Sequence, residues 1–209
     1  MSGGFTGRMR EEISANGARA VMTVPLRVMR GLWRSRQVWF WTMRVPITVP
    51  TQSVEELTAA DLPCLMAEET FPWRSDAGAS VRFSGGSQLF ALREAGRLVS
   101  YGWVTRSPRI LVGELGGWVE LDQPVRWIWD CVTPETHRGR GYYPQLIREL
   151  VTRGGAVTPV IYCTRENTSS QRGIEKAGFV HSFTITERWL KPSFRAGPQP
   201  LKFTYRRAS

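Results

Sequence analysis

Apolar residues recur along the chain at two spacings, and these predict an order of strands and helices. Residues 38–45 form a nearly continuous apolar run, which is typical of a buried strand. Thr58 and Asp61 have the spacing of a helix-opening capping pair. Because Pro63 is tolerated only in a first helical turn, we expect a helix to begin at this pair and to end near residue 70.

The middle of the chain favours strands. Residues 88–93 and 97–105 are rich in β-forming side chains, and the Glu-Ala-Gly sequence at 94–96 between them is a hairpin signal. Residues 118–121 and 127–132 predict two further strands.

Helices and strands alternate in the second half. Residues 144–153 carry apolar side chains at helical spacing, and residues 157–163 form a short apolar run that predicts a strand. A second helix is expected after Asn167, and residues 183–189 alternate apolar with polar side chains, as a half-exposed strand would.

Between residues 127–132 and the helix at 144–153 lies the sequence Arg138-Gly139-Arg140-Gly141. Glycines at a strand-to-helix junction let backbone N–H groups approach a phosphate, and the following helix adds the positive end of its dipole. The two arginines add positive charge at the same place. The segment therefore predicts a pyrophosphate cradle, although a glycine-rich turn also serves as plain chain punctuation.

The cradle is followed by a helix, a strand and then Asn167 at the opening of a helix that ends in Gly178-Phe179. With Arg138 and Gly141, these residues resemble the GNAT acetyltransferase superfamily over about residues 127 to 180. The resemblance implies that the loop binds the pyrophosphate of coenzyme A. It also implies that Asn167 contacts the pantetheine arm.

The resemblance implies an α+β fold with a central mixed, mostly antiparallel β-sheet, two splayed parallel strands and flanking helices, over residues 38–190. The co-substrate would be acetyl-CoA or another acyl-CoA, with its pantetheine arm along the edge of the strand that ends near residue 132. The expected coenzyme-binding residues are Cys131, Val132, Thr133, Arg138, Gly139, Arg140, Gly141, Tyr142, Tyr143, Asn167 and Ser170.

Two departures from the family pattern concern the chemistry. Tyr143 stands where the family usually has a small residue, so its ring must turn away from the phosphate path. Ile174, seven residues after Asn167, stands where the family often has the tyrosine that protonates the leaving thiolate. The acid is therefore unassigned, and Tyr142 and Tyr143 are the nearest phenols; we take Tyr142 as the candidate.

An acceptor amine is protonated at neutral pH, so acyl transfer also needs a base. Asp130 lies on the strand beside the expected thioester, and Glu114 and Glu120 lie on the preceding segment. We take Glu114 and Asp130 as the candidates. The alternative for each is a solvated or ion-paired carboxylate.

The chain of 209 residues has a net charge of +10, but the excess lies at its ends. Residues 1–45 contribute +6 and residues 190–209 contribute +5, whereas residues 46–189 contribute −1. A nucleic-acid partner is therefore not expected. Three cysteines and two histidines at scattered positions indicate neither a disulfide framework nor a metal site, and a reducing cytoplasm fits best.

Residues 1–37 form a basic, amphipathic N-terminal arm, in which Leu26, Met29 and Trp33 fall on one side of a helix. The arm could lie on the inner face of an anionic membrane, it could pack on its own domain or a partner, or it could be an unprocessed disordered end. A homo-oligomer is a separate open alternative. The arm lacks the apolar core of a secretory signal. Residues 191–209 form a basic C-terminal tail, expected to be irregular apart from a short strand at 201–205.

The resemblance implies an enzyme that transfers an acetyl group from acetyl-CoA to an amine of a small molecule. The segment Tyr101-Gly102-Trp103, taken with the loop and Asn167, looks like GNAT members associated with surface polysaccharide assembly, so an amino sugar is one candidate acceptor. Two alternatives are open. One is transfer of a longer acyl chain, from coenzyme A or an acyl carrier protein, at a membrane surface. The other is a non-catalytic domain that binds coenzyme A and a partner.

Overall fold

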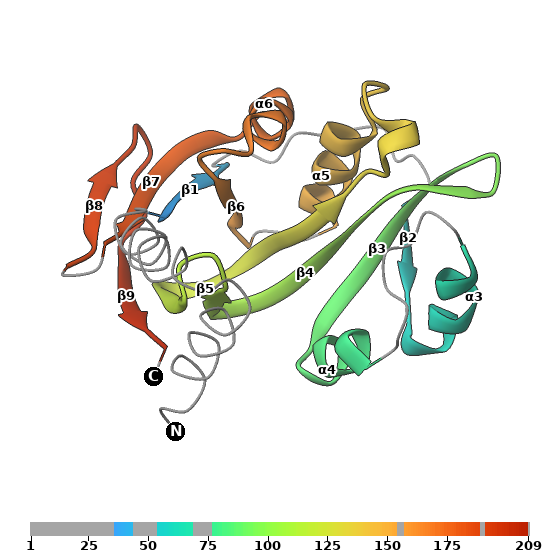
Figure 1. Ribbon diagram of the computed structural model, residues 1–209, viewed down its shortest axis with the longest axis horizontal. Coiled ribbons are helices and arrows are strands. Elements are labelled where there is room, and N and C mark those ends of the chain that lie inside the picture. Colours follow the sequence, from blue (N-terminus) through green and yellow to red (C-terminus); the bar gives the residue numbers. More distant parts are fainter. Residues whose placement is uncertain (1–35, 44–53, 69–76, 154–156, 189–190, 209) are drawn as a thin grey trace, which may run out of the picture.

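The computed structural model describes residues 36–43, 54–68, 77–153, 157–188 and 191–208. Their strands form a sheet in the order β2-β3-β4-β5-β6-β1-β7-β8, and β9 pairs with β5 away from this path (Figure 1). The strands are β1 (Arg36–Thr42), β2 (Val54–Leu57), β3 (Ser87–Glu94), β4 (Arg97–Val112), β5 (Gly117–Val132), β6 (Pro159–Thr164), β7 (Val180–Glu187), β8 (Ser193–Ala196) and β9 (Phe203–Arg207). Among the described strands, β5 and β6 are the parallel pair and all other pairings are antiparallel.

Helices cover both faces of the sheet. Helices α5 (Tyr142–Thr152) and α6 (Thr168–Lys176) lie on one face, where Leu146, Ile147 and Ile174 pack on the buried side chains of β1, β3 and β6. The short helices α3 (Leu62–Ala67) and α4 (Ala77–Ser84) cover the opposite face of β3 and β4. The predicted mixed α+β class is confirmed.

The far half of the β4–β5 hairpin bends over the face that α5 and α6 do not cover. Its residues Ile110, Val112 and Val119 share a buried cluster with Phe40 on β1 and Phe183 on β7. The turn of the hairpin is therefore brought toward the β6–β1–β7 side of the sheet. This bend matters for the site, because Glu114 lies in that turn.

Several local signals are confirmed. The side chain of Asp61 accepts hydrogen bonds from the Thr58 amide at 2.7 Å and the Thr58 hydroxyl at 2.8 Å, and this pair opens a short 3₁₀ turn that continues into α3. Ala95 and Gly96 both have positive φ, as a two-residue hairpin turn requires. The helix ends at Ala67, a few residues before the predicted end.

The two strands predicted at 118–121 and 127–132 are wrong as separate elements, because β5 runs unbroken from Gly117 to Val132. Strand β4 is equally long and pairs with β5 on both sides of a register shift, and Asp122, Gln123 and Pro124 lie within that shift. Pro108 and Pro124 fall where the β4–β5 register shifts, so neither proline removes a ladder hydrogen bond that the sheet needs.

The C-terminal residues contribute more structure than their composition indicates. The strand expected at 201–205 is β9, which pairs with the far half of β5, and an unpredicted strand, β8, pairs with β7. Both are short and largely exposed, so their apolar pattern is too weak to read from the sequence. Among the described residues, no helix combines the length and apolar character needed to cross a membrane.

Gly102 on β4 allows the sheet to close around Cys131. A Cβ at this glycine would lie 2.6 Å from the Cys131 Sγ and 3.4 Å from a methyl carbon of Leu150 on α5. The residues on either side, Tyr101 and Trp103, are fully buried, so the backbone has little room to shift.

We therefore expect Gly102→Ala to lower the free energy of unfolding by about 1–3 kcal/mol, through overpacking. Removal of the facing sulfur in the Gly102→Ala/Cys131→Ala double variant should recover much of that loss. Urea unfolding followed by tryptophan fluorescence would measure the coupling between the two positions. Strictly additive effects would contradict the proposed contact.

Candidate functional site

Strands β5 and β6 are paired over a short distance and then separate. Their parallel register covers Arg126 with Pro159, Trp127 with Val160 and Ile128 with Ile161. Beyond Ile128 and Ile161, β5 continues to Val132 and β6 to Thr164 without further pairing. The gap leaves the β6-facing edge of β5 available to an extended ligand, which could add to it as a strand.

A β-bulge lies at the point where the gap opens. Asp130 has φ +47°, and β5 carries one more residue than β4 between the pairs Trp103–Trp129 and Tyr101–Val132. A bulge reverses the alternation of side chains. As a result Cys131 packs on the α5 side with Ile128, whereas Asp130 forms an ion pair of 2.5 Å with Arg82 on α4.

The loop after β5 supplies backbone suited to an anion. After the 3₁₀ turn Glu135–His137, Gly139 and Gly141 have φ of +81° and +85°, a conformation that non-glycine residues rarely adopt. Helix α5 starts directly after Gly141, so the positive end of its dipole lies at the loop. The Arg138 side chain donates to the carbonyl of Thr133 at 3.2 Å, which ties the loop to the end of β5.

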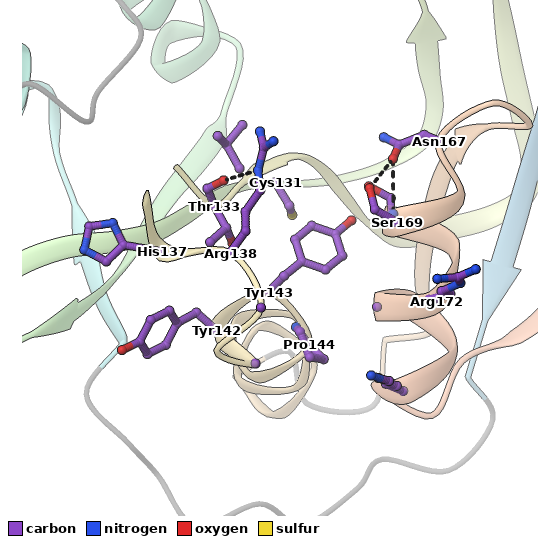
Figure 2. A pocket seen from close by; sticks show the side chains of 16 residues that line it. Cys131, Thr133, His137, Arg138, Tyr142, Tyr143, Pro144, Asn167, Ser169 and Arg172 are labelled. Carbon is purple, nitrogen blue, oxygen red and sulfur yellow. Dashed lines mark hydrogen bonds between the residues drawn. The ribbon is translucent and has the colours of Figure 1, made fainter. Parts of the chain in front are cut away.

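Helix α6 begins at the other side of the gap with a side-chain cap. The Asn167 Oδ1 accepts hydrogen bonds from the Ser170 amide at 3.1 Å and the Ser169 hydroxyl at 3.0 Å (Figure 2). Asn167 thus acts as the N-cap, which supplies an acceptor to a backbone N–H of the first helical turn. The Asn167 oxygen is thereby occupied within the protein, which leaves its amide N–H groups for a ligand.

These elements enclose a cavity of about 670 Å³. It collects ten of the eleven predicted coenzyme-binding residues, and Arg140, Glu114 and Asp130 are not among its lining residues. The lining residues are Cys131, Val132, Thr133, His137, Arg138, Gly139, Gly141, Tyr142, Tyr143, Pro144, Asn167, Ser169, Ser170, Arg172, Gly173 and Lys176.

The cavity wall is positively charged. Arg138 on the loop and Arg172 and Lys176 on α6 line it, two helices begin beside it, and none of the described residues that line it is acidic. Sequence reasoning missed Arg172 and Lys176. Their spacing of four residues puts them on one helix face, but only the fold shows that this face meets the loop.

The two neighbouring tyrosines point to different surroundings (Figure 2). The exposed Tyr142 hydroxyl donates a hydrogen bond to Glu94 in the β3–β4 hairpin, and this bond raises the pKa of the phenol. The Tyr143 ring lies between α5 and α6, directly over Gly173, and burial raises its pKa well above the usual range. Its ring therefore avoids the loop by packing against the second helix.

The candidate bases lie on the other side of the gap from α5 and α6. Asp130 pairs with Arg82, whose guanidinium stacks 4.4 Å from the centre of the Trp129 ring. Burial raises the pKa of Tyr162 on β6, and the charges of Glu114 and Asp130 raise it further. Both carboxylates thus act on one phenol at the open end of the gap, although they are far apart in the chain.

Residues 52–179 match the Acetyltransferase (GNAT) family. This match covers more than half of the chain, and the chain belongs to that family. No curated protein matched it in the corresponding search.

Two solved structures share the fold. A GNAT-family acetyltransferase from Colwellia psychrerythraea has a TM-score of 0.53 and 11% identity, over 73% of this chain and 55% of its own. A GNAT-family protein from Novosphingobium aromaticivorans has a TM-score of 0.51 and 21% identity, over 73% of this chain and 63% of its own. The chain thus spans 55% and 63% of the lengths of these two proteins.

Gly141 offers a test of the loop. An added side chain meets nothing within 4 Å there, so Gly141→Val costs backbone strain of about 1–2 kcal/mol and projects its methyl groups into open space at the cavity. We expect coenzyme A affinity, measured by calorimetry, to fall at least about tenfold.

Gly96 provides the matched control, because it has φ +78°, equally open surroundings and a position outside the cavity. Gly96→Val should show a comparable loss of thermal stability with unchanged coenzyme A affinity. Unchanged affinity in a folded Gly141→Val variant would overturn the assignment of the loop.

Asn167 offers a second test, which separates capping from ligand binding. Asn167→Ala removes the acceptor of two hydrogen bonds and should lower the free energy of unfolding by about 1 kcal/mol. Asn167→Asp keeps the cap and so keeps the stability, but it loses the amide N–H groups. If Asn167 contacts pantetheine, both variants raise the KM for acetyl-CoA; an unchanged KM in both would restrict Asn167 to capping.

Proposed function

We propose that this chain is an N-acetyltransferase that moves an acetyl group from acetyl-CoA to the amine of a small molecule. The observation that carries the proposal is the single cavity formed by the loop at residues 138–141, the first turn of α6 and the separated edge of β5. Its positive charge suits a polyanionic coenzyme, and the end of β5–β6 pairing beside it leaves the edge of β5 free for the pantetheine arm.

In this proposal the pyrophosphate binds to the backbone of Gly139 and Gly141 at the start of α5, with Arg138 and Arg172 as counter-charges. The pantetheine arm follows the unpaired edge of β5 at Cys131 and Val132. Its thioester then lies in the gap between β5 and β6. Acetyl-CoA supplies the activated acyl group, and the protein supplies orientation and proton transfer.

The acceptor would enter from the face that carries α4 and the turn of the β4–β5 hairpin. This face presents the carboxylates of Glu114 and Asp130 beside Trp129 and Tyr162, which is suited to a cationic amine with an adjoining apolar or sugar-like surface. Donor and acceptor would therefore approach the gap from opposite sides. An amino sugar remains one candidate within this class of acceptor.

Of the two carboxylates, we propose Glu114 as the base, directly or through a water, because Asp130 is already paired with Arg82. Glu114→Gln should lower kcat at pH 7 about 100-fold while coenzyme A affinity stays the same, since the change removes proton acceptance and keeps volume. Steady-state kinetics over a pH series would measure this effect.

Glu120→Gln is the matched control, because Glu120 is an exposed carboxylate on the same hairpin and should leave kcat unchanged. Asp130→Asn tests the remaining candidate. If Asp130→Asn loses activity while Glu114→Gln keeps full activity, the base is Asp130 and not Glu114.

The reaction itself is tested by acetyl-CoA consumption with a panel of polyamines, amino acids and amino sugars, with loss of the thioester as the readout. Acyl donors of increasing chain length test the longer-chain alternative. Tight retention of coenzyme A without turnover of any donor would instead support a non-catalytic binding domain.

The N-terminal arm and its membrane, protein or oligomer contacts stay predictions, because residues 1–35 lie outside the described part of the chain.

A further inference from the structure

The ring of Tyr143, at the start of α5, packs directly against Gly173 of α6. A Cβ built on Gly173 would lie 2.5 Å from Cδ1 and 2.8 Å from Cε1 of the Tyr143 ring. No larger residue fits at position 173 while the ring stays in place. Helix α6, which carries Ile174 as a buried core residue, thus makes room for a phenol that comes from the start of α5.

The hydroxyl end of Tyr143 reaches the gap in the sheet. In Figure 2 the ring points from α5 toward Cys131 and the first turn of α6. The thiols of Cys131 on β5 and Cys163 on β6 raise the pKa of this phenol beyond the effect of burial, whereas Ser170 on α6 lowers it. Groups on both separated strands and on α6 therefore surround it.

A thiolate in this gap is poorly solvated. Burial raises the pKa of the Cys131 thiol strongly, and it raises the pKa of Cys163 to about 12, with a smaller contribution from the charge of Glu114. The same desolvation acts on any sulfur that occupies the gap. A thiolate leaving from a thioester there would be strongly basic and would require a proton or a strong hydrogen bond.

We propose that Tyr143 donates this proton to the sulfur of the departing coenzyme A. The inference rests on the acetyl transfer proposed above. The amine nitrogen attacks the thioester carbon, the C–N bond forms, and the C–S bond breaks with its electron pair going to sulfur. The phenolic proton passes to that sulfur and gives the thiol; the base takes the proton of the amine, and the phenolate regains a proton from solvent through the cavity.

Tyr142 is less suited to the role. Its hydroxyl already donates to Glu94, and it is exposed on the hairpin side of the loop, away from the gap. Tyr143 instead keeps its proton at neutral pH because of burial, and it donates into a region where charge is poorly solvated.

The first test compares acetyl-CoA with acetyl-seleno-coenzyme A, whose selenolate leaves without protonation because selenols are much stronger acids than thiols. Tyr143→Phe keeps the ring over Gly173 and should lower kcat about 100-fold with acetyl-CoA. It should lose little with the selenium donor. Equal losses with both donors, or no loss with either, would overturn the role of Tyr143.

Tyr142→Phe serves as the competing variant in the same assay. A large loss that is confined to acetyl-CoA in Tyr142→Phe, with none in Tyr143→Phe, would move the acid to Tyr142. If the wild-type protein turns over neither donor, the proposed function fails, and only the binding test below still bears on Tyr143.

The second test uses binding alone and therefore needs no acceptor. Burial in the gap raises the thiol pKa of bound coenzyme A, which weakens its binding as pH rises through the pKa of the free thiol. A protonated phenol beside the sulfur stabilises the thiolate and offsets part of this loss. The charged or titratable groups around the site are Cys131, Cys163, His137, Arg138, Tyr142, Arg172 and Lys176, with Glu114 and Asp130 across the gap, and all are retained in Tyr143→Phe.

Calorimetry with coenzyme A and with desulfo-coenzyme A between pH 7 and about 9.5 spans the usual range of thiol pKa values. The ratio of the affinity for coenzyme A to that for desulfo-coenzyme A should therefore fall with pH, and it should fall more steeply in Tyr143→Phe than in the wild-type protein. Identical pH dependence in the two proteins would show that Tyr143 does not contact the sulfur.

Discussion

The bulge at Asp130 is the constraint on which the rest of the site depends. It takes an unfavourable backbone conformation for a non-glycine residue, of the kind that costs about 1–3 kcal/mol, and it is held by surrounding contacts. Arg82 pairs with the carboxylate, and Gly102 leaves space for the displaced Cys131 on the opposite strand. The bulge coincides with the end of β5–β6 pairing and turns Cys131 toward the helices. One irregular residue thus links the gap, its backbone edge and the separation of the two faces.

Local signals in the sequence were sufficient to predict the loop and the helix start that line the cavity. The glycine loop, the helix after it and the capping residue Asn167 depend on backbone conformation within a few residues, so their residue types carry the information directly. The Glu-Ala-Gly hairpin turn was readable for the same reason. The family resemblance then supplied the arrangement of these pieces around a coenzyme, and ten of the eleven predicted residues line one cavity.

Features that depend on tertiary neighbours could not be read in this way. Strand β5 is unbroken because the long β4 and the C-terminal β9 pair with it. The residues of β5 alone do not indicate either partner. Likewise, Gly173 is an unfavourable residue inside a helix when the sequence alone is considered. The structure explains it, because the ring of Tyr143 fills the space that a side chain at position 173 would need. Glu114 lies near the open gap because the β4–β5 hairpin bends, and no local sequence pattern predicts this bend.

The sheet also separates opposite charges. Arg138, Arg172 and Lys176 line the cavity beside α5 and α6, whereas the carboxylates of Glu114 and Asp130 lie across the gap. Residues 46–189 are close to neutral overall, so this polarity comes from arrangement and not from an excess of either sign. Because Asp130 is paired with Arg82, Glu114 is the carboxylate that the proposed cationic amine would meet on its face, whereas the proposed polyanionic coenzyme would be attracted to the cavity. In the proposed reaction the two substrates would meet at the gap, where a poorly solvated departing sulfur would require a nearby proton donor.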